Sequence, residues 1–180
     1  MGKRIAVRVV AGALVALAAA CGGGGGGGNP VEPPTASLVF TPAQNQTANS
    51  LALVRSNGTD PNSLALDLRG TGVSDLYGAA FDLTYPASLR FDGATEGTWL
   101  NGGGAQTSLQ VATGTNRLTV GITRLGALTG VTGDGTLLTL RFSAVAAGSG
   151  SIEFVAPNAY TTTSTAYTVR WIGGSVAVTR

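Results

Sequence analysis

The stretch from Leu76 to Phe91 reads LYGAAFDLTYPASLRF, and its residue pattern decides the fold class. The first ten residues alternate between an apolar or aromatic set (Tyr77, Ala79, Phe81, Leu83, Tyr85) and a small or polar one. This period of two predicts a half-buried β-strand. Pro86 has no N–H to give to a neighbouring strand, so we expect the strand to end there.

The rest of the chain after residue 36 repeats this pattern. Short alternating or β-branched runs are separated by Gly, Pro, Asn and Asp, which is typical of a sandwich or barrel. We expect about nine strands from eleven candidate runs: Ser37 to Thr41, Leu51 to Arg55, Ser63 to Leu68, Leu76 to Tyr85, Leu89 to Ala94, Thr107 to Val111, Arg117 to Thr123, Thr136 to Val145, Ser151 to Val155, Tyr167 to Trp171 and Ser175 to Thr179.

Five of these runs carry apolar side chains that should share one core between two sheets. Asp134-Gly135 and Gly173-Gly174 have the composition of tight reversals with positive φ. The expected core residues are Leu64, Leu66 and Leu68; Leu118, Val120 and Ile122; Leu138, Leu140 and Phe142; Ile152 and Phe154; and Val176 and Val178.

The amino-terminal residues have the pattern of a secretory signal over residues 1–20. Lys3 and Arg4 precede a short apolar run, and small residues follow it. Residues 17–21, LAAAC, resemble the bacterial lipoprotein signal, which implies lipid attachment at Cys21, an anchor in the membrane and a position at the cell surface. Cys21 is the only cysteine of the chain, so an internal disulfide is impossible. Residues 21–35, rich in Gly and Pro, should form a tether to a folded domain at residues 36–180.

Charge and composition exclude several functions. Three of the eleven basic residues lie in the first eight positions, so the chain after Ala20 has eight Arg against nine acids, a formal net charge of −1. No basic patch suggests nucleic acid as a partner. The chain has no His, and the domain has no Lys or Cys, which removes the usual hydrolase bases and transition-metal ligands.

The domain's carboxylates show no spacing typical of a glycosidase pair, so we expect no catalytic residue and no cofactor. They are Asp60, Asp67, Asp75, Asp82, Asp92, Glu96, Asp134 and Glu153. Asp60 could help to bind calcium, but an Asx turn is the preferred interpretation, and we expect no metal site.

Two spaced segments resemble cohesin domains. Residues 83–89, LTYPASL, are similar to the family's "L-x-Y-D-P-x-x-L", although the Asp is missing, and residues 133–142, GDGTLLTLRF, are similar to "D-G-x-L-x-x-I-x-F". Residues 173–178, GGSVAV, resemble the closing "G-G-x-V-x-V". The resemblance implies a nine-stranded jelly-roll β-sandwich that binds calcium-loaded dockerins and is close in fold to some carbohydrate-binding modules.

The resemblance also implies where a partner binds, namely on one sheet face built from four strands. If these strands are Leu76 to Tyr85, Thr107 to Val111, Arg117 to Thr123 and Ser151 to Val155, alternation selects the outward residues. No aromatic residue is expected on this face, and Arg117 is its one obvious anchor. The expected partner-binding residues are Asp82, Thr84, Ser108, Gln110, Arg117, Thr119, Thr123 and Glu153.

Other functions remain open from the sequence. The outward residues could form only a solvated sheet face, since Thr is common in strands. Trp99 and Trp171 could stack on sugar rings in a carbohydrate-binding module that attaches polysaccharide, or could be half-buried in the sandwich. The domain could also be a structural part of the cell envelope.

Overall fold

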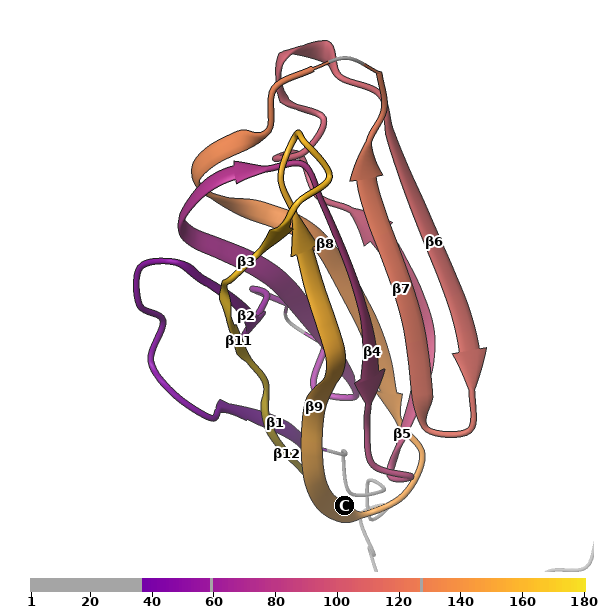
Figure 1. The fold of residues 1–180 in the computed structure, drawn as a ribbon. Helices are drawn as coiled ribbons and strands as arrows, with labels where there is room; N and C mark the ends of the chain where they lie inside the picture. Colours follow the sequence, from indigo (N-terminus) through magenta and orange to yellow (C-terminus); the bar gives the residue numbers. More distant parts are fainter. Residues whose placement is uncertain (1–36, 59, 127) are drawn as a thin grey trace, which may run out of the picture. The chain divides into compact units, whose positions relative to one another are not determined.

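The computed structural model describes residues 37–58, 60–126 and 128–180. In this part the chain forms twelve strands and one short 3-10 helix, η1, at Gly102–Gly104 (Figure 1). No helix there has the length and apolar character needed to cross a bilayer. The strands are β1 Ser37–Pro42, β2 Ser50–Arg55, β3 Ser63–Leu76, β4 Gly78–Thr84, β5 Leu89–Glu96, β6 Thr107–Gly114, β7 Arg117–Arg124, β8 Val131–Ala144, β9 Gly148–Tyr160, β10 Ala166–Tyr167, β11 Arg170–Ile172 and β12 Gly174–Thr179.

Two sheets pack face to face, so the expected jelly-roll β-sandwich is confirmed. One sheet has the strand order β1-β12-β9-β4-β7-β6, with β10 paired to β9, and the other has the order β11-β2-β3-β8-β5. All pairings are antiparallel except that of β11 with β2. The first strand, β1, lies at a sheet edge and pairs with the last, β12.

The core lies between the sheets, on the residues that alternation selects. In β4, Ala79, Phe81 and Leu83 are buried while the residues between them are partly exposed. Every apolar residue expected in the core is buried except Phe154, which is partly buried and packs against the core. Burying apolar surface is the main favourable term in folding, which is why period-two runs of Leu, Val and Phe determine the architecture.

The number and the ends of the strands differ from expectation: all eleven candidate runs contain a strand and one contains two, so there are twelve described strands instead of about nine, and β3 and β8 extend beyond their apolar runs. β3 continues past Leu68 through register shifts near Gly72 and Asp75, which both have positive φ. Leu76, expected at the start of the next strand, therefore closes β3. The run Tyr167 to Trp171 is not one strand: it crosses between the sheets as β10, paired with β9, and β11, paired with β2.

The residue pairs Asp134-Gly135 and Gly173-Gly174 do not make the tight reversals with positive φ that the sequence predicted. Asp134 and Gly135 lie inside β8, where Gly135 pairs with Gly70 of β3. Neither Gly135, Gly173 nor Gly174 has positive φ, and each is needed for space instead. A Cβ on Gly173 would lie 2.2 Å from the carbonyl oxygen of Ile152, so the backbones approach too closely for any side chain.

Candidate binding face

Four strands, β9, β4, β7 and β6, lie side by side and present one continuous outer surface (Figure 1). We call the outward residues of these strands the hydroxyl-rich face. Residue pairing across the strands forms rows on this face. The rows are Glu153–Thr84–Arg117, Val155–Asp82–Thr119, Ala80–Gly121–Gln110 and Tyr160–Gly78–Thr123–Ser108. The structure thus brings all eight residues selected by alternation onto one surface.

Asp82 has the densest polar contacts on this face. Its carboxylate accepts hydrogen bonds from the Arg117 guanidinium and, at 2.5 Å, from the Thr119 hydroxyl. These hydrogen bonds lower the pKa of Asp82 below its ordinary value of 3.8, and the one from Arg117 has the largest effect. Arg117, the anchor expected from the sequence, is thus paired with Asp82 across the face.

A shallow hollow of about 400 Å³ lies at the end of the face. Its floor consists of Gly78, Ala80 and Gly121, and we call it the small-residue hollow. A Cβ added to Gly121 would meet nothing within 4 Å, so the space above this residue is open. Ser108, Gln110 and Tyr160 stand around the hollow. The face is therefore flat with one recess, which can accept a protruding side chain of a partner.

Two exposed apolar side chains on the face were not predicted from the sequence. Val155 lies opposite Asp82 and is 37% exposed, and Tyr160 lies opposite Gly78 and is 36% exposed. The expectation of a face without aromatic residues is wrong because β9 does not end at Val155. It continues past an irregularity at Ala156, which has positive φ, and past Pro157. Proline in a run signals a strand end, so the sequence concealed this extension.

Trp99 is half-buried and packs against the core. Its indole lies over two glycines that pair with each other on β3 and β8. Added Cβ atoms would approach the indole to 2.3 Å at Gly70 and to 2.2 Å at Gly135. The two glycines thus form a slot for the ring, and this packing gives Trp99 a structural role.

Trp171 closes the side of the sandwich between the two sheets. Its ring centroid lies 5.5 Å from that of Phe81 and 5.0 Å from that of Phe154. It also borders an open hollow of about 400 Å³, together with Phe154, Glu153 and Pro157. Trp171, one of the two tryptophans proposed as sugar contacts, therefore lies next to a recess.

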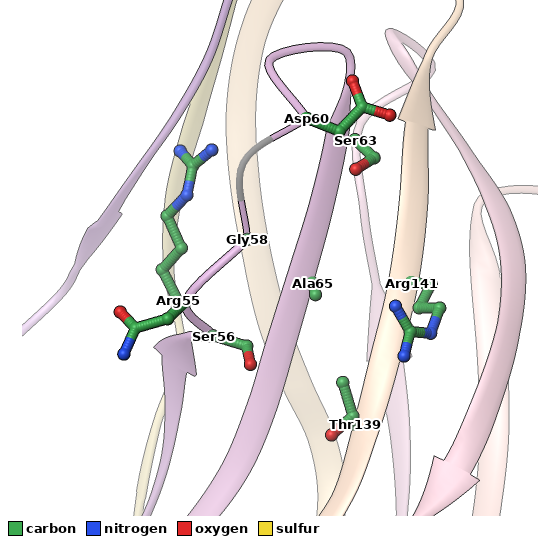
Figure 2. Close-up of a pocket in the computed structure, with 9 residues that line it drawn as sticks. Arg55, Ser56, Gly58, Asp60, Ser63, Ala65, Thr139 and Arg141 are labelled. Atoms are coloured by element: carbon green, nitrogen blue, oxygen red, sulfur yellow. The ribbon is translucent and has the colours of Figure 1, made fainter.

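A third hollow, of about 300 Å³, lies on the other sheet (Figure 2). Figure 2 shows Asp60 near the beginning of β3, Ala65 on this strand and Arg141 on the neighbouring β8. Asp60 accepts the Asn62 N–H at 2.8 Å, which confirms the Asx turn. Within the described residues, no group of three or more acidic, His or Cys side chains could hold a metal ion.

Most of the other carboxylates also have structural partners. Asp75 accepts hydrogen bonds from Gly130 N, at 3.0 Å, and from the Thr162 hydroxyl and N–H. Asp67 accepts from Thr139, Asp92 from Arg90 and Ser143, Glu96 from Thr107, and Asp134 from Gly72 N. These bonds join strands and loops, so they explain the scatter of acids along the sequence. The expected signal over residues 1–20, the expected lipid attachment at Cys21 and the expected tether at residues 21–35 lie outside the described residues.

Solved structures show which known fold this is. No protein-family model and no curated protein matches the chain. The chain is similar to a non-cellulosomal cohesin from the archaeon Archaeoglobus fulgidus (TM-score 0.52, 15% identity, covering 79% of this chain and 89% of that chain). It is also similar to a cohesin of Acetivibrio cellulolyticus scaffoldin B solved with a dockerin (TM-score 0.54, 18% identity, 72% and 97% covered).

A third similar structure is a type II cohesin from Bacteroides cellulosolvens (TM-score 0.56, 10% identity, 78% and 98% covered). The coverage of the solved domains is nearly complete, so the likeness extends over a whole cohesin sandwich. The domain has the cohesin fold, and the family resemblance is confirmed at the level of the fold.

Proposed function

We propose that this domain is a non-catalytic, cohesin-like module that binds a protein partner, a calcium-loaded dockerin, through the hydroxyl-rich face. The observation that carries the proposal is the arrangement of β9, β4, β7 and β6 into one flat surface with a recess. Domains with the same fold can have different functions, so the proposal rests on the shape and chemistry of this surface. The cohesin of scaffoldin B, which has the same fold, was solved in complex with a dockerin.

The chemistry of the face suits a partner that presents helices. The Ser108 hydroxyl can donate and accept hydrogen bonds, whereas the hydroxyls of Thr84 and Thr119 already donate within the face and offer their oxygens as acceptors. Val155 and Tyr160 supply apolar contact, and interface hot spots favour aromatic residues. The ion pair of Asp82 and Arg117 is formed before binding, so little side-chain entropy is lost when a partner meets it. Calcium would belong to the partner, not to this domain.

The test is a Gly121→Arg variant, which fills the small-residue hollow from its floor. Because the space above Gly121 is open, this substitution should leave the fold intact. A matched control is Thr95→Arg, at an exposed position of β5 on the other sheet. Secreted and envelope proteins of the source organism would be passed over each immobilised protein, with calcium and with chelator, and the retained proteins identified by mass spectrometry.

We expect the unmodified domain and Thr95→Arg to retain a dockerin-bearing protein only with calcium, and Gly121→Arg to lose it. Calorimetry with that purified dockerin should show similar affinities for the unmodified domain and Thr95→Arg, and a loss of binding for Gly121→Arg. Equal binding by Gly121→Arg and the unmodified domain would exclude this face, and retention that ignores the chelator would exclude a dockerin.

The anchor is a separate part of the proposal. We infer that Cys21 is lipid-modified and holds the domain at the outer surface of a bacterial envelope, where the partner takes part in polysaccharide degradation. The lipoprotein-like signal before Cys21 supports this. Mass spectrometry of the mature amino terminus should show the lipid, and Cys21→Ser should abolish it. An unmodified Cys21 in membrane-extracted protein would refute the anchor.

A second function is favoured by one observation, the hollow beside Trp171. An aromatic ring next to the carboxylate of Glu153 is chemistry that could hold a sugar ring. Binding of soluble polysaccharide that Gly121→Arg leaves unchanged and Trp171→Ala removes would support this alternative.

A further inference from the structure

The β6 strand is an open edge of its sheet. It ends the strand order and pairs with β7 alone, in a regular register from Thr107 to Gly114. Among the described residues, its backbone makes no hydrogen bond to any other segment. Backbone N–H and C=O groups along such an edge are free to pair with another strand.

The other sheet edges carry the protection that proteins use against such pairing. β5 has Arg90, Asp92 and Glu96 and a register shift after Phe91. β1 ends at Pro42, and the Arg55 guanidinium donates to its Leu38 carbonyl. β11 is only three residues long. In contrast, β6 reads TSLQVATG, with no charge, no proline and no bulge over eight residues.

We propose that two copies of this domain associate by antiparallel pairing of β6 with β6, about a two-fold axis at Gln110. Such an axis places Gln110 opposite its own copy, Leu109 opposite Val111, and Thr107 opposite Thr113. In these three kinds of pair, polar meets polar and apolar meets apolar, which stabilises cross-strand pairs, and Ser108 meets the small Ala112. Because the strand carries no charge, a second copy meets no like-charge repulsion. Isologous contacts of this kind are the commonest in homo-oligomers.

The pairing would also cover apolar surface. Leu109 and Val111 pack against the core from the edge but remain partly exposed. A second β6 in this register brings four such side chains together on the inner side of the edge. The two-fold axis is perpendicular to the sheet, so the hydroxyl-rich faces of both copies lie on the same side of one continuous sheet. The dimer would thus present two faces to a bivalent partner.

Single cysteines test both the pairing and its register. The described core lies between Leu38 and Val178, so residues 34–180 can fold without the leader, and they contain no native cysteine. In the proposed register, Gln110→Cys places two cysteines directly opposite each other, within the Cα separation of about 4.4–6.8 Å that a disulfide needs. Ser108→Cys faces Ala112 of the other copy and should cross-link far more slowly. Thr95→Cys, on β5, is the control for random collision.

We expect disulfide dimers in the order Gln110→Cys well above Ser108→Cys and Thr95→Cys. Equal rates for the three would overturn the proposal. Sedimentation velocity supplies a second measurement without cysteine. Gln110→Lys places two like charges at the axis on the exposed side of the strand, so it should shift the domain to monomer, whereas Thr95→Lys should not. A domain that is monomeric at every concentration, or a dimer that Gln110→Lys leaves intact, would also overturn it.

Discussion

The guanidinium of Arg117 bonds to the carboxylate of Asp82 diagonally across two paired strands. The residue directly opposite Asp82 is Thr119, whose hydroxyl holds the other carboxylate oxygen. Both oxygens are thereby fixed in the middle of the hydroxyl-rich face. This arrangement determines how the face responds to acid and which polar groups it offers to a partner.

Asp82→Asn should reduce the pH dependence of stability. The folded-state pKa of Asp82 lies below its ordinary value, so its contribution is present above the unfolded-state pKa and is lost as pH falls through the folded-state pKa. The melting temperatures of the variant and the unmodified domain should therefore differ most near neutral pH and converge in acid. Thermal unfolding across the acid range checks this. A difference that grows toward low pH would contradict it.

Asp75→Ala should loosen the junction that this side chain bridges. Asp75 lies at the last register shift of β3 and accepts hydrogen bonds from the backbone N–H groups of Gly130 and Thr162. Removing the carboxylate leaves the Thr162 N–H without its acceptor, whereas the Gly130 N–H keeps the Thr162 hydroxyl oxygen, 2.7 Å away. Hydrogen exchange should therefore accelerate more at the amide of Thr162 than at that of Gly130, with little change in β12. Unchanged exchange at both amides would show that the loops are held by other contacts.

Trp99→Ala should destabilise the domain without changing ligand binding. Loss of this large ring from the slot over Gly70 and Gly135 leaves a cavity, and we expect a loss of about 3 kcal/mol in the free energy of unfolding. Urea denaturation measures it. Trp99→Phe, which keeps a ring, should lose less. If Trp99→Ala instead retained full stability and abolished polysaccharide binding, the indole would be a ligand contact.

Gly173→Ala and Gly121→Ala form a matched pair of minimal substitutions. At Gly173 the new methyl group would lie 2.2 Å from the Ile152 carbonyl oxygen, whereas at Gly121 it would meet nothing within 4 Å. We expect Gly173→Ala to lose about 1–3 kcal/mol of stability by overpacking and Gly121→Ala to remain close to the unmodified domain. Equal melting temperatures for the two variants would refute the close approach.

Sequence patterns predicted the sandwich and its core because a period of two fixes which side chains point inward. The same alternation placed Asp82, Thr84, Arg117 and Thr119 on one outer face. It could do so because these residues lie on the adjacent strands β4 and β7, which have regular registers.

Features that depend on irregular backbone or on distant contacts could not be predicted in this way. The bulge near Ala156 carries β9 past Pro157 to Tyr160, and no local pattern marks it. The pairing of Gly70 with Gly135 under Trp99 joins three segments far apart in the chain, so these glycines look like turn residues in sequence. The ion pair of Arg117 depends on a diagonal reach across strands, which alternation does not specify.

The edge position of β1 has a mechanical consequence. Suppose that the chain is held at its amino-terminal side while a partner is bound to β4 and β7. Tension then acts on β1 first and is resisted by its six residue pairs with β12, from Ser37 with Thr179 to Pro42 with Gly174. When these pairs part, the next resistance is β2 at Ser50, in the other sheet. β1 would then detach first under load and lengthen the amino-terminal connection, while the hydroxyl-rich face stays folded.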